Sequence, residues 1–275
     1  MLFHRLTDYD DAYANGLHIA RGETWLVKWT ELAEAFRSGL SVHRCRLGIP
    51  YGQGAPRQVF DLFLPESEPR GLFVYIHGGY WLRNDGSLWS HLAAGPLARG
   101  YAVAIPTYRL CPEVRIGEIV GDIADAIKEA SRLVAGPLTL AGHSAGGQLA
   151  SRMICAESPL GDETWGRVER VVSISGVHDL RPLLRTAMRD ALRLDDEEAR
   201  RESPVLLDPA PGAKLVCWVG GAERAEFRRQ NALLANVWTG LGAATAAYEA
   251  PDRHHFSVVD DLEDPESGLV SALFG

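Results

Sequence analysis

LTLAGHSAGGQLA, residues 138–150, is the most informative stretch of this 275-residue chain. It begins like a buried strand, ends in the small residues of a packed helix, and carries the pattern G-x-S-x-G (142–146) between them. A serine on such a strand-to-helix turn is strained in a way that exposes its hydroxyl, and the glycines avoid collisions with flanking side chains. Ser144 is therefore a candidate nucleophile, and the amide of Ala145 at the start of the helix can donate to a developing oxyanion.

A second stretch, FVYIHGGYWLR at residues 73–83, begins as a strand covered on both faces and then breaks into bare backbone. The two glycines leave room for the amides of Gly78, Gly79 or Tyr80 to point at a reacting carbonyl group, which makes them candidate oxyanion donors together with Ala145. His77 is expected to have a structural role, because turn glycines follow it at once.

The rest of the chain alternates between strand and helix patterns. Strands are expected at 41–49, 59–64, 72–77, 101–107, 137–142, 171–175, 214–219 and 244–249. Helices are expected in the N-terminal stretch to about residue 38, at 112–133, 145–156 and 223–239, and at the C-terminus. Short apolar strands that alternate with helices predict an α/β fold with a mostly parallel sheet covered on both faces.

Residues 177–211 interrupt this rhythm with a long polar segment of mixed charge. We expect a small helical cap insertion there, over the carboxyl edge of the sheet, where ligands bind in open α/β folds. The whole chain, 1–275, is expected to form one domain that includes this cap.

Composition excludes several classes of protein. The formal net charge is −8 with no basic block, so nucleic acid is not an expected partner. No stretch reaches the ~18 consecutive apolar residues of a membrane span, and residues 1–11 do not resemble a secretion signal. The four cysteines lie far apart without metal-ligand spacing, as in a reducing compartment, so a cytoplasmic protein is expected. No metal or cofactor is expected.

The glycine motifs together resemble a known family. HGGYW at 77–81 with GHSAGG at 142–147 is similar to the kynurenine formamidase (arylformamidase) branch of the α/β-hydrolase esterase superfamily. YRLCPE at 108–113 is similar to a stretch of hormone-sensitive-lipase-like esterases. The resemblance runs from about residue 59 to 256. It implies an α/β-hydrolase fold and hydrolysis of formanilides, aryl esters or other small acyl compounds.

The resemblance also implies the partners of the serine, since the acid and the histidine follow it in that order along the chain. Glu223 comes just after the strand at 214–219, where most family members have aspartate, and Glu226 is the alternative. His255 fits the His-Phe pattern near the C-terminus, and His254 is the alternative. Asp179 is expected to cap a helix.

Three residues are expected to contact substrate: Tyr80, Trp81 and His143. Packing of both aromatics in the core is the alternative, but as a gate they would restrict the site to formyl or acetyl groups. The predicted partner is a small acyl amide or ester, and a homodimer is left open. A general short-chain carboxylesterase is the second hypothesis, and a catalytically inactive binding module on the same fold is the third.

Overall fold

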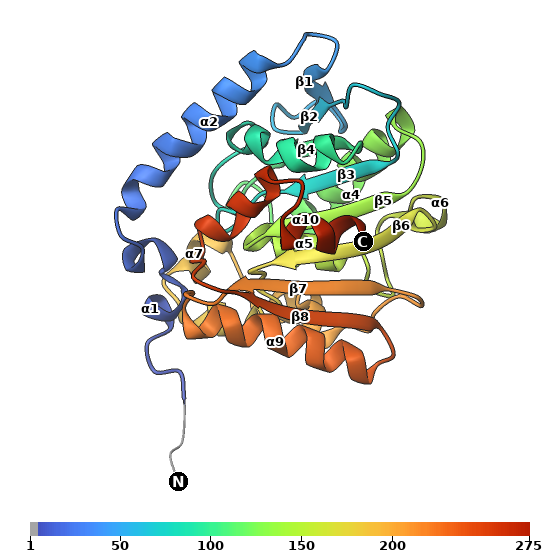
Figure 1. Cartoon of the computed structure of the whole chain (residues 1–275). Coiled ribbons are helices and arrows are strands. Elements are labelled where there is room, and N and C mark those ends of the chain that lie inside the picture. The colour runs from blue at the N-terminus through green and yellow to red at the C-terminus, as the bar shows by residue number, and fades with distance from the viewer. Residues whose placement is uncertain (1–4) are drawn as a thin grey trace.

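The protein is built around one twisted eight-stranded sheet, described here from a computed structural model that covers residues 5–275 (Figure 1). The strands are β1 (Cys45–Pro50), β2 (Val59–Phe63), β3 (Leu72–Ile76), β4 (Ala102–Thr107), β5 (Leu138–His143), β6 (Val168–Ile174), β7 (Lys214–Gly220) and β8 (Ala244–Ala250). Their order in the sheet is β1-β2-β4-β3-β5-β6-β7-β8. The first two strands are antiparallel to their neighbours, and β4, β3 and β5 to β8 are all parallel.

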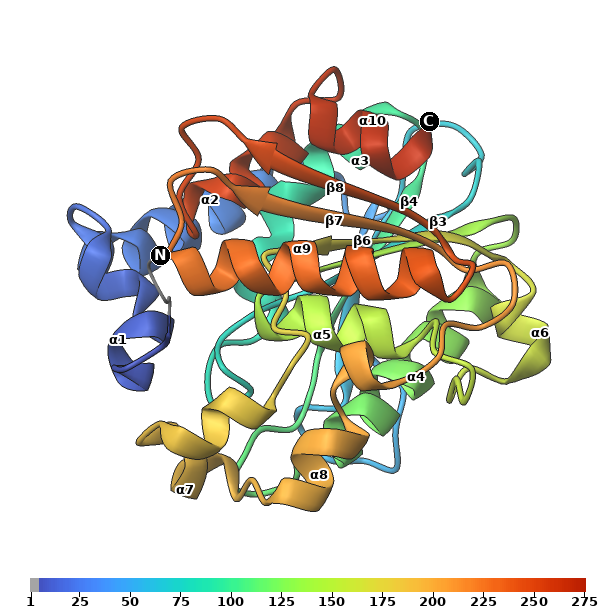
Figure 2. The ribbon, with the colours of Figure 1, turned by 90° about the horizontal axis from the view of Figure 1, so that it is seen from below.

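Helices cover both faces of this sheet, as Figure 2 shows. The α-helices are α1 (Tyr9–Tyr13), α2 (Trp25–Gly39), α3 (Ala94–Ala98), α4 (Ile116–Leu133), α5 (Ala145–Arg152), α6 (Gly161–Trp165), α7 (Met188–Leu192), α8 (Asp196–Arg201), α9 (Ala225–Gly240) and α10 (Gly268–Phe274). Helices α4, α5 and α9 pack on one face, and α3 and α10 lie on the other. The α/β-hydrolase fold expected from the sequence is confirmed.

Two apolar cores lie on the two faces of the sheet because successive side chains of a strand point in opposite directions. In β3, Leu72, Val74 and Ile76 belong to the core under α4 and α5, whereas Phe73 and Tyr75 belong to the other core. All five residues of β3 are buried. This double burial explains why the strand is a continuous apolar run.

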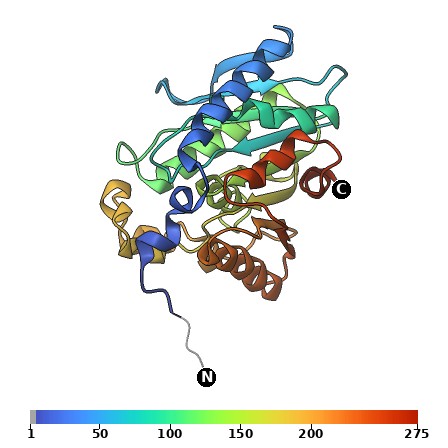
Figure 3. The ribbon, with the colours of Figure 1, turned by 60° about the vertical axis from the view of Figure 1, so that its left-hand side comes forward.

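The segment 177–211 is helical, as expected, with 3-10 turns at Arg181–Arg185 and Pro204–Leu206 beside α7 and α8. Figure 3 shows it next to the N-terminal helix α1. There Asp10 Oδ1 accepts a hydrogen bond from the backbone N–H of Ala187 at 2.7 Å. Asp179 Oδ1 accepts from the N–H of Arg181 at 3.1 Å, but the N-cap position of this 3-10 turn is Leu180 and no side chain caps it, so the expectation that Asp179 is a helix cap is wrong.

Two expectations concern the membrane and the N-terminus. No helix within residues 5–275 has the length and apolar character to cross a bilayer. The expectation that residues 1–11 are not a secretion signal falls partly on residues 1–4, which lie outside the described residues.

Candidate active site

Ser144 occupies a sharp turn between β5 and α5, with φ 57° and ψ −117°. This is a strained conformation for a residue that carries a side chain. A Cβ atom at Gly142 would lie 1.9 Å from the carbonyl oxygen of Gly146, and one at Gly146 would lie 2.0 Å from that of Ile76. The expected turn is therefore present, and the glycines on both sides of Ser144 are required by its close packing.

Glu223 and His255 meet beside this turn. Glu223 Oε2 lies 2.6 Å from His255 Nδ1, and both side chains are almost fully buried. Glu223 Oε1 accepts hydrogen bonds from Ser175 Oγ at 2.5 Å and from the N–H of Gly220 at 2.8 Å. Both carboxylate oxygens are therefore occupied, which fixes the acid and, through it, the orientation of the imidazole ring.

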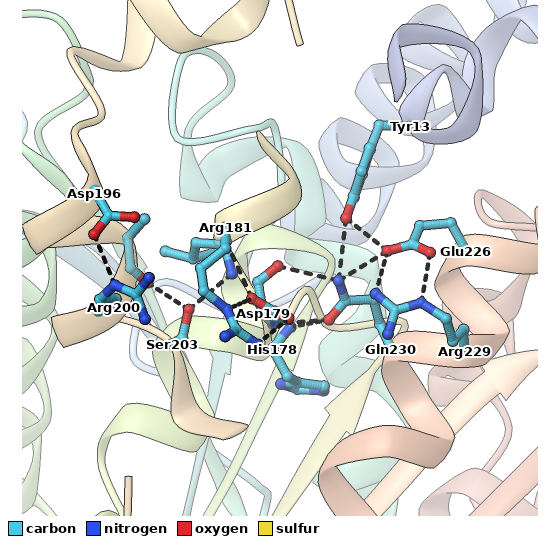
Figure 4. A network of polar contacts seen from close by, with 12 residues as sticks. Tyr13, His178, Asp179, Arg181, Asp196, Arg200, Ser203, Glu226, Arg229 and Gln230 are labelled. Atoms are coloured by element: carbon cyan, nitrogen blue, oxygen red, sulfur yellow. Dashed lines mark hydrogen bonds and ion pairs between the residues drawn. The ribbon is translucent and has the colours of Figure 1, made fainter. Parts of the chain in front are cut away.

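The two alternative residues lie elsewhere. Glu226 points away from His255 into a polar network, where its Oε1 accepts a hydrogen bond from Tyr13 Oη at 2.7 Å and the carboxylate pairs with Arg229 (Figure 4). His254 packs edge-on against Trp25 at a centroid distance of 5.0 Å. Neither residue lines the cavity beside Ser144.

Ser144 and His255 both line a cavity of about 260 Å³. No hydrogen bond between Ser144 Oγ and His255 is present among the described residues, although both face the same space. Contacts of this kind are often long without substrate and shorten in the Michaelis complex.

The turn at residues 78–84, which we call the glycine turn, packs directly on the serine turn. A Cβ atom at Gly78 would lie 2.8 Å from the carbonyl oxygen of His143 and 3.0 Å from Ser144 Cβ. Gly79 has φ +129°, and a Cβ atom there would lie 2.3 Å from the carbonyl oxygen of Arg83. One glycine therefore permits close approach to Ser144, and the other permits the bend.

The aromatic pair after these glycines has a conformation that the sequence does not reveal. Tyr80 and Trp81 both adopt left-handed backbone angles, with φ of 58° and 59°. Tyr80 Oη donates to the carbonyl oxygen of Tyr13 at 2.7 Å, and Trp81 Nε1 donates to Gln148 Oε1 at 3.1 Å. The hydrogen bonds of the Tyr80 and Trp81 side chains therefore stabilise the unfavourable left-handed backbone conformation of both residues.

These anchors place the two side chains in different surroundings. Tyr80 lines the cavity, as expected for a substrate contact. Trp81 does not line it, and the expectation that Trp81 contacts substrate is wrong. Its indole is 1% exposed, since the left-handed backbone directs it into the core against α5.

Two histidines near the serine are held in the neutral form. His143 lines the cavity, and its Nε2 donates to the carbonyl oxygen of His255 at 2.8 Å. Burial, together with the nearby His255, lowers the pKa of His143 well below its ordinary value. His77 stacks on Tyr108, and burial lowers its pKa to about 4, in line with the structural role expected for it.

The front wall of the cavity comes from a part of the chain that sequence reasoning did not connect with the site. It is formed by Gly22 and Glu23, in the 3-10 turn Gly22–Thr24, and by Leu26 and Trp29, in the first turns of α2. Trp29 packs on Trp89, another cavity residue, at a centroid distance of 4.6 Å. No residue of 177–211 lines the cavity, so its cover comes from the N-terminal segment. The sequence signal for this wall is the helical spacing of Trp25, Trp29 and Phe36.

The donors needed for a metal site are not grouped within residues 5–275. No set of three histidine, cysteine, aspartate or glutamate side chains converges there.

Comparisons with known proteins agree with this architecture. A family profile described as the alpha/beta hydrolase fold matches residues 73–257. Kynurenine formamidase of Drosophila melanogaster is 30% identical, with 88% of this chain and 83% of that protein covered. Kynurenine formamidase of Danio rerio is 27% identical over 85% of this chain and 82% of that protein.

A solved structure extends the likeness over the whole chain. A protein from Silicibacter sp. TM1040, assigned provisionally as a thioesterase, is 47% identical, with a TM-score of 0.92 over 98% of this chain and 99% of that one. The fold, the matched profile and these relatives lead to one conclusion: the chain belongs to the α/β-hydrolase family, in its formamidase-like branch, and is a hydrolase.

Proposed function

We propose that this hydrolase removes small acyl groups, formyl or acetyl, from aryl amides or aryl esters through a covalent acyl-serine intermediate. The observation that carries the proposal is the Glu223–His255 hydrogen bond of 2.6 Å beside a serine on a strained turn. An acid that orients a histidine next to a serine that lines a cavity is the arrangement required for nucleophilic acyl transfer.

In this mechanism Ser144 Oγ attacks the carbonyl carbon of the substrate while His255 Nε2 takes the hydroxyl proton. Glu223 holds Nδ1–H and stabilises the imidazolium ion that forms. The amide of Ala145 and an amide of residues 78–80 donate to the oxyanion. His255 then protonates the leaving amine or alcohol, and water attacks the acyl-serine to release the acid and regenerate the enzyme.

The size and lining of the cavity support a small substrate. Its volume of about 260 Å³ lies near the lower end of ligand pockets. Trp29, Tyr80, Trp89 and Phe256 give it aromatic walls suited to a flat ring.

Wild type and Ser144→Ala should be compared on formanilide and on phenyl esters of increasing acyl length. We expect wild type to prefer one- and two-carbon acyl groups, and the alanine variant to lose about a million-fold in kcat. A phosphonate should add once per chain, at Ser144, as detected by peptide mass spectrometry. Near wild-type turnover by Ser144→Ala would overturn the proposal.

A general short-chain ester or thioester hydrolase is the second candidate. It is supported by the 47% identity to the Silicibacter protein, which is provisionally assigned to thioester cleavage. Both candidates use the same residues and differ in the leaving group. Comparing kcat/KM for formanilide, phenyl acetate and acetyl thiophenol separates them, since only a formamidase hydrolyses the stable amide efficiently.

A further inference from the structure

Two charged residues line the cavity without a part in the proposed acyl transfer: Arg83 on the glycine turn and Glu23 on the N-terminal wall. They do not form an ion pair with each other or with any other group among residues 5–275. The cavity therefore has one uncommitted cation and one uncommitted anion on walls that also carry four aromatic side chains, Trp29, Tyr80, Trp89 and Phe256.

The side chain of Arg83 differs from that of a neighbouring arginine with a clear structural role. Arg57 Nε donates to the carbonyl oxygen of Tyr108 at 2.8 Å. The Arg83 guanidinium has no hydrogen-bond acceptor among the described residues and rests over the Tyr80 ring, 5.2 Å from its centroid. An arginine stacked in this way keeps its planar set of N–H donors available for a carboxylate.

The backbone under Arg83 is fixed relative to the reacting groups. Its N–H donates to the carbonyl oxygen of Gly79 at 3.1 Å. The next residue, Asn84, is held at φ +73°, and its carbonyl oxygen accepts from Arg57. The Arg83 side chain is therefore attached to a well-fixed part of the glycine turn. The other end of the same turn, residues 78–80, carries the proposed oxyanion donors.

We propose that Arg83 binds a carboxylate on the leaving group, so that the enzyme selects anionic aryl substrates over neutral ones. This rests on the proposed function, since it requires the acyl carbon to lie at Ser144. With a formyl or acetyl group there, the aryl ring lies in the aromatic cavity, and an acid group on that ring reaches the guanidinium above Tyr80. A paired guanidinium and carboxylate form two parallel hydrogen bonds, which favour one orientation of the ring.

The test uses two matched substrate pairs, formanilide with 3-formamidobenzoate and phenyl acetate with 3-acetoxybenzoate. In Arg83→Met, which keeps the aliphatic bulk, we expect kcat/KM for the carboxylated member to fall about tenfold or more, through KM. The neutral member should change by less than about twofold. Arg83→Lys should restore only part of the preference, because ammonium lacks the planar set of donors.

Glu23→Gln is the control for a general charge effect at the cavity wall. If only the net charge of the wall mattered, this variant would raise kcat/KM for the anionic substrates as much as Arg83→Met lowers it. A direct contact from Arg83 instead predicts that any rise in Glu23→Gln is much smaller than the loss in Arg83→Met. An equal loss on both members of a pair in Arg83→Met, or no loss on either, would overturn the assignment.

A binding measurement keeps this inference separate from the proposed function. Calorimetry of 3-aminobenzoate and aniline with Ser144→Ala, with and without Arg83→Met, needs no turnover. Weaker binding of 3-aminobenzoate in the double variant, with aniline unchanged, would support Arg83 even if wild type hydrolysed none of the four substrates. Unchanged binding of both would reject it.

Discussion

Two glutamates three positions apart illustrate how surroundings decide the role of a residue. Glu223 contacts His255 and two fixed donors, whereas Glu226 contacts Tyr13, Gln230 and Arg229. The first environment holds the imidazole ring of His255 in place, and the second connects α1 to α9 (Figure 4). Their substitution should therefore affect different properties of the enzyme.

Glu223→Ala should lower kcat by about 10³–10⁴-fold, as expected when a histidine loses the acid that orients it. Glu226→Ala should leave kcat within about tenfold but lower the free energy of unfolding by about 3 kcal/mol, because buried partners lose their acceptor. Steady-state kinetics and urea denaturation of both variants check this. A larger kcat loss in Glu226→Ala would exchange the two roles.

Tyr80→Phe tests whether the hydroxyl anchor holds the glycine turn. Loss of the hydrogen bond to the carbonyl oxygen of Tyr13 removes about 1 kcal/mol that opposes the strain at φ 58°. We expect kcat to fall about fivefold with KM unchanged, because misplaced amides affect the transition state more than the ground state.

Tyr51→Phe is a matched control for this change. Tyr51 Oη also donates to a backbone carbonyl oxygen, that of Thr107 at 2.6 Å, but Tyr51 does not line the cavity. If both variants lost the same activity, the effect of Tyr80→Phe would be general destabilisation.

At the scale of elements, the sheet could be predicted from the sequence and the cavity wall could not. The strands are short runs between turn residues, and the central parallel ones are apolar and buried, so local patterns identify all eight strands within a few residues. The pattern of α2 indicates an apolar face without revealing which surface covers it. That surface is formed by Trp89 and Phe256, which are distant in sequence from Trp29.

The same limit applies to the aromatics after the glycines. Sequence identified Tyr80 and Trp81 as unusual but could not separate them. Their separation depends on two consecutive left-handed residues, and a non-glycine residue rarely adopts this conformation without tertiary anchors. The relation between Glu223 and His255 could be anticipated only through the family resemblance and the chain order of the fold.

Trp29→Leu should widen the cavity from the side of α2. We expect the ratio of kcat/KM for phenyl butyrate to that for phenyl acetate to rise by about tenfold, as an added pocket volume relieves a clash. Trp25→Leu is the matched control, because Trp25 lies on the same helix and is not a cavity residue. An unchanged ratio in Trp29→Leu would mean that α2 does not limit chain length.

At the scale of the whole molecule, four buried histidines couple stability to pH. Burial lowers the pKa of His77 and His91 to about 4 and that of His178 to about 3, and lowers that of His143 strongly. In the unfolded chain these four side chains therefore bind protons below pH 6.5, the ordinary pKa, whereas in the folded protein they stay neutral to a lower pH. The free energy of unfolding should fall as the pH is lowered from 6.5 toward 4. Each of these histidines contributes up to about 1.4 kcal/mol for each pH unit.

Urea denaturation between pH 8 and about pH 4.5 measures this slope. Burial raises the carboxyl pKa values of Asp61 and Asp260, which act in the opposite direction at the acid end. The decisive comparison is therefore with His91→Leu, which should reduce the slope, and with the exposed control His43→Gln, which should not. Equal slopes in wild type and His91→Leu would contradict the expectation.

The origin of the front wall has a consequence for engineering. The proposed reacting groups sit on loops at the ends of the strands, whereas Glu23 and Leu26 belong to a segment that precedes the sheet in the chain. Libraries randomised at these two exposed positions, or exchange of residues 22–29 between relatives, should diversify substrate choice while the reacting groups stay intact. Directed evolution of new activities would begin most safely at this end of the polypeptide.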